Sequence, residues 1–145
     1  MCIRDSDYND SKYLPCAYVM CDCNDLKVVN DQFGHETGDQ YIQLVGDIFK
    51  FVVDKKGICI RWGGDEFLLV LPNCDEKAVK LILEQIEYEE ELKRKILPQI
   101  EVSKGFCIRS HMEQPENTVI QMADQDMYRN KLKRKEQRNG NQGRI

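Results

Sequence analysis

The sequence predicts an α+β fold of the ferredoxin-like type, in which helices pack on a mainly antiparallel sheet. The chain has 145 residues, of which 41% are hydrophobic, and this suits one domain with a modest core. Segments with strand and helix periodicity follow one another in the order β-α-α-β-β-α-β-α, without an internal repeat or a low-complexity linker. Two of the strand segments flank a Gly-Gly turn, which is typical of an antiparallel hairpin.

The composition excludes several classes of protein. The 21 Lys and Arg residues are outnumbered by 25 Asp and Glu, so the net charge of -4 has the wrong sign for a general nucleic-acid binder. No apolar run approaches the roughly 18 to 20 residues that cross a bilayer, so we expect a soluble protein without a membrane segment. The seven cysteines are odd in number and mostly single, which predicts free thiols in a cytoplasmic protein.

The first strand and the first helix follow directly from the pattern. Residues 16–22 form an apolar run that we interpret as a buried central strand ending in Asp22. For Cys21 and Cys23 on this run, buried thiols are favoured over a metal site. Asn24 is predicted to cap a short helix that Gly34 ends.

The next elements are a long helix and a hairpin. Residues 37–40 match the spacing of a capping box, so they predict the start of a second helix that continues to about Asp54. Residues 58–62 and 67–71 then predict two paired strands around Gly63 and Gly64.

Two helices and one strand complete the predicted fold. Residues 75–97 predict a helix whose run of glutamates, including Glu90, is interpreted as a solvated face. Residues 100–108 predict a strand, and a last helix is expected after Pro115.

We expect residues 137–145 to form a disordered tail. The first six residues lack the apolar core of a signal peptide, and our hypothesis for them is a junction or processing scar.

Carboxylates gather at one predicted edge of the sheet. If the first strand neighbours the hairpin, Asp22 would meet Asp65 and Glu66 there. Such a group suits a divalent cation such as Mg²⁺, which binds one or two carboxylates together with waters and substrate phosphates. The alternative is that these acids are only exposed turn residues, since Asp and Glu are common near Gly-Gly turns. From these residues alone, both interpretations stay open.

Three motifs resemble those of one known family. Residues 61–67 (RWGGDEF) resemble the defining hairpin of the GGDEF domain, the catalytic domain of diguanylate cyclases. Residues 22–39 (DCNDLKVVNDQFGHETGD) are similar to the upstream pattern of that family, and residues 123–131 (ADQDMYRNK) are similar to its C-terminal helix motif. The resemblance implies a palm-type, nucleotidyl-cyclase-like sheet and a GGDEF domain over residues 13–136.

The resemblance also implies roles for individual residues around the metal. Asp22, Asp65 and the backbone carbonyl of Cys23 would be oxygen ligands of Mg²⁺ or Mn²⁺, with Glu66 supporting them. For Glu66, an ordinary turn carboxylate that pairs with a nearby cation is an equal alternative. The implied catalytic residues are Asp65, as general base for the ribose 3′-hydroxyl, Glu66 and Lys27.

The implied substrate is GTP. Asn30 and Asp39 would recognise the guanine, because a carboxylate accepts from N1–H and the 2-amino group while an amide serves another edge. Gly63 and Gly64 would let phosphates approach the turn closely. The implied GTP-binding residues are Asn30, His35, Asp39, Gly63, Gly64, Lys131 and Lys135. Without the resemblance, each polar side chain among them would be an ordinary helix-end or surface residue.

The sequence departs from the family at three places. Where the family has an Arg-x-x-Asp motif for product inhibition, this chain has residues 54–57 (DKKG). Nothing before Tyr13 resembles the usual first helix of the family, so we interpret residues 1–12 as a non-family segment and expect a truncated start without its N-terminal regulatory domain. At the position of Lys135 the family often has Arg. The lysine keeps the positive charge but cannot form the paired hydrogen bonds of a guanidinium group.

The leading hypothesis is therefore a diguanylate cyclase that condenses two GTP into cyclic di-GMP and two pyrophosphates. Its two half-sites would face each other in a homodimer. The alternatives are a catalytically silent GTP-binding regulatory module and an inactive fragment.

Overall fold

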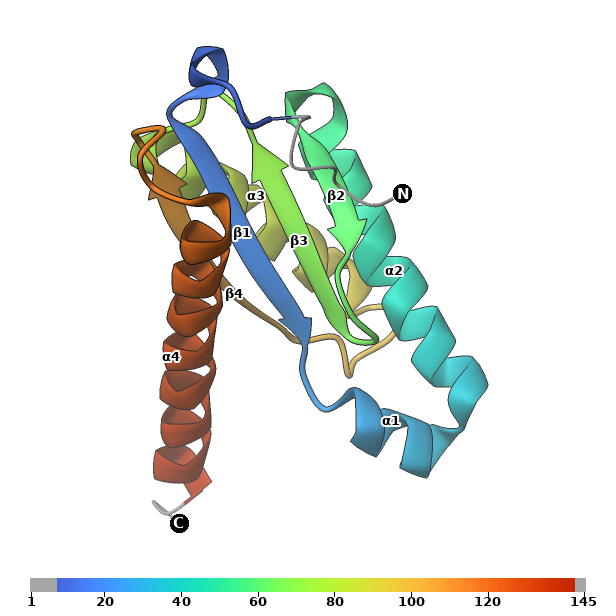
Figure 1. Ribbon diagram of the computed structural model, residues 1–145. Helices are drawn as coiled ribbons and strands as arrows, with labels where there is room; N and C mark the ends of the chain where they lie inside the picture. Colours follow the sequence, from blue (N-terminus) through green and yellow to red (C-terminus); the bar gives the residue numbers. More distant parts are fainter. Residues whose placement is uncertain (1–7, 143–145) are drawn as a thin grey trace.

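The computed structural model describes residues 8–142 of the chain (Figure 1). Short 3₁₀ turns at Ser11–Tyr13 and Asp54–Lys56 accompany four strands and four helices. These are β1 (Cys16–Cys23), α1 (Leu26–Phe33), α2 (His35–Val53), β2 (Ile58–Arg61), β3 (Glu66–Leu71), α3 (Glu76–Lys93), β4 (Val102–Arg109) and α4 (Glu116–Gln142). The predicted order of elements is confirmed.

The strands form one antiparallel sheet in the order β2-β3-β1-β4. Strand β1 lies in the interior between β3 and β4, and all eight of its residues are buried. This placement explains its nearly continuous apolar run, since neither of its faces meets water. The predicted α+β class is thereby confirmed.

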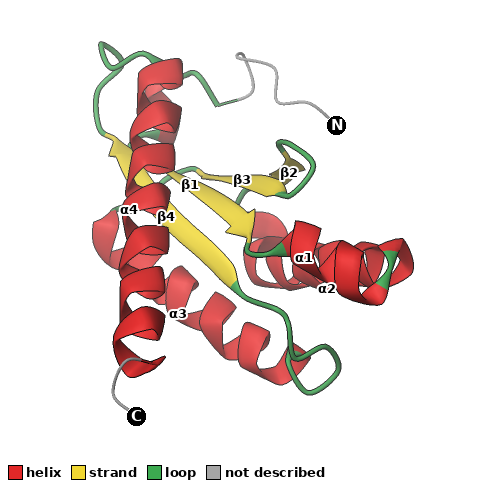
Figure 2. Cartoon of the chain, turned by 90° about the horizontal axis from the view of Figure 1, so that it is seen from below, coloured by secondary structure: helices red, strands yellow, loops and turns green. Residues whose placement is uncertain are grey.

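Helices cover both faces of the sheet. Figure 2 shows α4 on one face and α2 and α3 on the other. Side chains alternate along a strand, so neighbouring residues of β1 and β3 enter different layers of the core. The larger layer includes Val19, Leu69, Val45, Ile48, Phe49, Val79 and Ile86, and the smaller one includes Tyr18, Met20, Leu68, Val70, Val119, Ala123 and Met127.

Helix α4 packs very closely on the edge strand β4. A Cβ atom added to Gly105 would overlap the backbone of Met127, so only glycine allows this approach. Asp126 Oδ2 accepts a hydrogen bond from the N–H of Phe106 at 2.9 Å, and Asn130 Nδ2 donates to the carbonyl of Lys104 at 2.7 Å. Side chains of α4 thus bond to backbone groups of an edge strand.

The predicted cap of the first helix is wrong. Asp25, not Asn24, occupies the N-cap position, with a φ of 60°, and it makes no side-chain capping bond. The amide of Asn24 is buried and exchanges hydrogen bonds of 2.8 and 3.0 Å with the Ser103 hydroxyl. The side chain thus ties the end of β1 to β4 and is not available to the helix.

The predicted capping box is also wrong. Helix α2 begins at His35, directly after Gly34, whose φ of 92° separates α1 from α2. The Thr37 hydroxyl donates to the carbonyl of Phe33 at 3.2 Å and caps no amide of α2. The sharp turn at Gly34 brings the helix start forward by about half a turn.

One residue of the acidic run in α3 does not face solvent as predicted. Glu90 is 1% exposed, and its Oε2 lies 2.6 Å from the Nζ of Lys104, which is also buried. Glu90 Oε1 accepts from the N–H of Val102 at 3.2 Å, and Lys104 donates to the Val102 carbonyl at 3.0 Å. The buried charges are therefore both paired and hydrogen-bonded.

Helix α4 continues to Gln142, so residues 137–142 are helical where a disordered tail was expected. Gln137 and Arg138 favour continuation of the helix, and Arg138 approaches Asp25 and Glu101 to 3.6 and 3.9 Å, although Asn139 and Gly140 are poorer helix formers. The hypotheses for residues 1–6 and for the end of the tail, 143–145, lie outside the described residues.

Within 8–142, no helix is both long and apolar enough to cross a membrane.

The close approach at Gly105 gives a first prediction. Gly105→Ala should lower the free energy of unfolding by about 1–3 kcal/mol, because the added methyl group pushes α4 away from β4. Chemical denaturation measures this loss. Gly140→Ala is the matched control: a Cβ there meets nothing within 4 Å and the residue lies in the last turn of α4, so this substitution should not lower the free energy of unfolding. Equal stability of Gly105→Ala and wild type would contradict the observed packing.

The buried ion pair gives a second prediction. Lys104→Met should cost about 3–5 kcal/mol, because Glu90 would remain as an uncompensated buried charge. The double variant Glu90→Gln with Lys104→Met keeps the acceptor for Val102 and removes the charge, so it should regain most of the stability. A double variant as unstable as Lys104→Met alone would show that packing, not charge, dominates this pair.

Candidate functional site

A carboxylate cluster, defined here as Asp22, Asp65 and Glu66, lies where β1 ends beside the hairpin. Asp22 pairs with Glu66 in the register between β1 and β3. The N–H of Cys23 donates to the carbonyl of Asp65 at 2.8 Å, which fixes the backbone of Asp65 against the strand end. Asp22 is 6% exposed, whereas Asp65 and Glu66 are partly exposed. The structure therefore brings the three predicted acids to one edge of the sheet.

A lysine from α4 completes this group. Lys131 Nζ lies 2.7 Å from Asp22 Oδ2, although 109 residues separate the two in sequence. The other oxygen, Asp22 Oδ1, is buried and has no hydrogen-bond partner among the described residues. A buried carboxylate oxygen without a partner is costly, and it points to a ligand that would satisfy it.

The charges in the cluster raise one another's pKa values. Burial raises the pKa of Asp22, the hydrogen bond from Lys131 opposes this rise, and repulsion from Asp65 adds to it. Burial also raises the pKa of Glu66, as do the negative charges of Asp22, Asp124 and Asp65. The pKa of Lys131 is raised as well: burial lowers it, but the hydrogen bond to Asp22 and the negative charges of Asp22, Asp65 and Asp25 together outweigh this effect. The site concentrates negative charge around one ammonium group.

The donors at this edge fit a hard divalent cation. Carboxylate oxygens and an unpartnered buried oxygen suit Mg²⁺, which needs only one or two protein carboxylates and fills its shell with water or phosphate. In residues 8–142, no three His, Cys, Asp or Glu side chains are arranged so that they could hold a metal ion together, so at most two side chains of the cluster would bind one ion directly. Burial strongly raises the pKa of the Cys23 thiol, so its sulfur stays protonated and is a poor ligand.

The Gly-Gly turn between β2 and β3 stands next to the cluster. The N–H groups of Trp62 and Gly63 donate to the carbonyl of Glu66 at 2.8 and 3.2 Å, and Arg61 donates to the carbonyl of Gly64 at 2.6 Å. Neither glycine has a φ in the left-handed region that favours glycine. A Cβ on Gly64 would meet nothing within 4 Å, and one on Gly63 would make only ordinary contacts. The protein itself therefore does not require glycine at either position.

A second group of predicted residues lies on α1 and α2. Lys27 is exposed on α1, and His35 is the exposed first residue of α2. The side-chain oxygen of Asn30 occupies the space that a Cβ on Gly38 would take, so Gly38 lets the two helices approach. Asp39 follows Gly38 and is exposed. Asn30 and Asp39 are thus brought to the same junction between α1 and α2.

Lys135 is the remaining predicted residue. It is exposed on α4, one helical turn beyond Lys131. The predicted residues thus fall into two groups, one at the end of β1 and one on α1 and α2, with Lys135 following the first.

Tyr41 is a supporting residue that the sequence analysis missed. Its buried hydroxyl donates to carbonyl oxygens, lying 2.9 Å from that of Asn24 and 2.6 Å from that of Glu101. The same hydroxyl accepts from the N–H of Glu101 at 3.0 Å. Tyr41 therefore holds the loop after β1 against the start of β4. A tyrosine on a buried helix face is a usable signal, because its hydroxyl normally finds a partner.

Comparison with known proteins gives the relationship. The family model described as "Diguanylate cyclase, GGDEF domain" matches residues 6–137, a range that begins earlier than the predicted domain start at residue 13. The chain is 35% identical over 72 residues to a diguanylate cyclase of Vibrio cholerae, covering 50% of this chain and 22% of that protein. It is 30% identical over 118 residues to diguanylate cyclase DosC of Escherichia coli (strain K12), covering 79% and 26%. The chain thus spans about a quarter of the length of these relatives.

Solved structures show the same fold. The GGDEF domain of DgcB from Caulobacter crescentus, in complex with c-di-GMP, is 30% identical and superposes with a TM-score of 0.71, covering 80% of this chain and 71% of that one. The active GGEEF domain of a Vibrio cholerae diguanylate cyclase is 26% identical, with a TM-score of 0.71 and coverage of 79% and 74%. With a family model that matches most of its length and these structures sharing its sheet, the chain belongs to the GGDEF domain family of diguanylate cyclases.

Proposed function

We propose that the chain is a diguanylate cyclase domain that condenses two GTP molecules into cyclic di-GMP and two pyrophosphates. In each half-reaction the 3′-hydroxyl oxygen of one nucleotide bonds to the α-phosphorus of the other. The bond from that phosphorus to the bridging oxygen of the β-phosphate breaks, and pyrophosphate leaves. The observation that carries the proposal is the carboxylate cluster, with its unpartnered Asp22 oxygen, beside the Gly-Gly turn.

The proposed cofactor is Mg²⁺ or Mn²⁺. Asp22, Asp65 and the backbone carbonyl of Cys23 would hold it, and Glu66 would support them. When bound, such an ion neutralises developing negative charge and lowers the pKa of a coordinated hydroxyl group. The fit rests on oxygen donors that crowd together with one unpartnered buried oxygen.

Asp65 is the proposed acceptor of the proton from the 3′-hydroxyl. It is partly exposed at the tip of the hairpin, where a nucleotide can reach it, and the bond from Cys23 N–H to its carbonyl holds its backbone in place. The proton would then pass to solvent. Asp22 is more deeply buried and is already bonded to Lys131, so it suits ligand binding better than proton transfer.

The phosphates would lie over the turn and meet three lysines. Neither the packing nor the backbone conformation requires glycine at positions 63 and 64. The absence of side chains there would leave open space for a phosphate, which is a sufficient reason for both glycines. Lys27, Lys131 and Lys135 would supply positive charge for the triphosphate and for the charge that develops on pyrophosphate.

The guanine would bind at the junction of α1 and α2. Asp39 would accept hydrogen bonds from N1–H and the 2-amino group of the guanine. The amide of Asn30 would form a hydrogen bond with another edge of the base. His35, exposed at the start of α2, is a further proposed contact to GTP.

Catalysis would require two copies of the domain. Each site holds one GTP, so two sites must face each other in a homodimer for the second bond to form. We propose that a regulatory domain outside this chain normally organises that dimer.

The proposed compartment is the cytoplasm, in agreement with the free thiols of the six cysteines in the described residues.

The activity is tested with concentrated protein, GTP and Mg²⁺, followed by chromatographic detection of cyclic di-GMP. Asp65→Asn should lower product formation at least about 100-fold, because an amide neither accepts the proton nor binds the cation well. Asp47→Asn is the matched control, since Asp47 is exposed on α2 and bonds only locally to Gln43. Product formed equally by both variants would contradict the role of Asp65. A folded wild type that binds GTP but forms no product would instead indicate a silent binding module.

The base specificity is tested by Asp39→Asn. The loss of a charged acceptor for two guanine donors should raise the KM for GTP about 10-fold or more, with little change in thermal stability because Asp39 is exposed. Steady-state kinetics with GTP and ATP measure this, and Asp47→Asn again serves as the control. Equal use of ATP and GTP by the wild type would remove the assignment of Asn30 and Asp39.

A further inference from the structure

A second pocket, called here the arginine pocket, lies between α1, the loop before β4 and the C-terminal half of α4. It has a volume of about 520 Å³, and its charged lining residues are Asp25, Arg94, Glu101, Arg134 and Arg138. Lys27 and Asn30, which the proposed function uses, do not line it; they project from another side of α1 than Val28 and Gln32, which do. The arginine pocket is therefore separate from the proposed GTP site.

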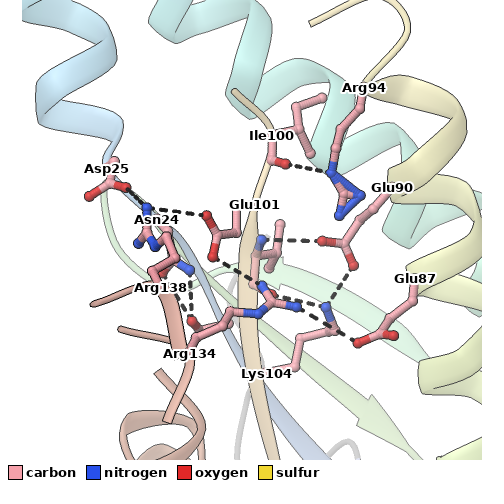
Figure 3. Close-up of polar contacts among 12 residues, drawn as sticks. Asn24, Asp25, Glu87, Glu90, Arg94, Ile100, Glu101, Lys104, Arg134 and Arg138 are labelled. Atoms are coloured by element: carbon pink, nitrogen blue, oxygen red, sulfur yellow. Dashed lines mark hydrogen bonds and ion pairs between the residues drawn. The ribbon is translucent and has the colours of Figure 1, made fainter. Parts of the chain in front are cut away.

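The guanidinium groups of Arg134 and Arg138 make only long contacts to carboxylates, although Arg134 also donates to the carbonyl of Val102 at 3.2 Å. Arg138 lies 3.6 Å from Asp25 and 3.9 Å from Glu101, and Arg134 lies 3.6 Å from Glu101 (Figure 3). These separations are longer than hydrogen bonds, so the attraction is mainly Coulombic. Arg94 donates through Nε to the carbonyl of Ile100 at 3.0 Å, which anchors its side chain beside the pocket. Each guanidinium has five N–H donors, so donors remain for an anion.

The charges of the lining favour an anionic ligand. The lining itself carries three arginines and two carboxylates, and the only further carboxylate near them among the described ion pairs is Glu87, which lies 3.9 Å from Arg134 outside the lining. Asp25 and Glu101 are partly exposed, so a ligand with two negative charges can replace their weak contacts to Arg134 and Arg138. A phosphate group presents several oxygens to planar guanidinium forks and binds them in bidentate fashion.

The uncharged part of the lining is mainly apolar, with Gln32 and Gln99 as its polar members. Val28 and Phe33 of α1 are 47% and 52% exposed, and Pro98 lines the opposite side. Water forms no hydrogen bonds with these side chains. Covering them with an aromatic ring or another compact apolar group is therefore favourable. The volume is in the range of small-molecule sites and is larger than a bare phosphate ion needs.

We propose that the arginine pocket binds a phosphate monoester that carries a planar or compact apolar group. The phosphate bridges Arg134 and Arg138, with Arg94 at the side, and the apolar group lies against Val28 and Phe33. The class includes mononucleotides and aryl phosphates, which share this chemistry.

The test is a calorimetric titration of the full chain with phenyl phosphate in a buffer without divalent cations. Saturable binding at one site is expected, and added salt should weaken it. Arg134→Gln and Arg138→Gln should each lower the affinity about 10-fold or more, because a charge-assisted hydrogen bond to the phosphate is lost. Arg138→Lys keeps the charge without the fork, so it should lie between wild type and Arg138→Gln. Thermal unfolding checks that each variant is folded.

Two controls locate the binding. Arg129→Gln removes an exposed arginine of α4 outside the pocket, and Lys131→Gln removes the cation of the carboxylate cluster. Arg129→Gln should bind phenyl phosphate like the wild type, whereas Lys131→Gln shows whether the phosphate binds at the carboxylate cluster instead. The proposal is overturned if no saturable binding occurs, or if Arg129→Gln weakens binding as much as Arg138→Gln. It is also overturned if only Lys131→Gln abolishes binding, or if inorganic phosphate binds as tightly as phenyl phosphate, since the apolar wall would then have no role.

Discussion

The contact between Asp22 and Lys131 is the interaction on which the candidate site depends. Asp22 lies at the end of a strand that is buried on both faces, so its charge is expensive to keep there. Lys131 provides one neutralising bond, and the second oxygen of Asp22 remains without a partner among the described residues. The fold thus holds a carboxylate in a position that an additional cation or hydrogen-bond donor would stabilise.

The position of Lys131 is determined far from the carboxylates. Helix α4 can place it over the end of β1 only because Gly105 allows backbone contact, and because Asp126 and Asn130 bond to the edge of β4. These three residues fix both the rotation and the height of α4 on the sheet. The chemistry at the end of β1 is therefore set by the packing between α4 and β4.

The sequence predicted those features that local patterns determine. The buried run before Asp22 and the hairpin around Gly63 and Gly64 follow from periodicity and turn chemistry, so the class, the order of elements and the carboxylate cluster were predictable. The ion pair of Glu90 with Lys104 was not, because it depends on which face of α3 meets β4. The hydrogen bonds of Asn24 and Tyr41 were missed for the same reason, since their partners come from distant segments.

Helix α4 has two halves that are stabilised differently, and Lys131 lies where they meet. The first half is buried through Val119, Ala123 and Met127, whereas the second is polar and touches the fold mainly through Arg134 and Arg138. Exposed ion pairs contribute only about 0.2–1 kcal/mol each, and salt screens them. The C-terminal half should therefore loosen first as ionic strength rises, while Gly105 keeps the first half in place. Because Arg138 contacts Asp25, three residues after Asp22, any such loosening begins beside the loop that follows the candidate site.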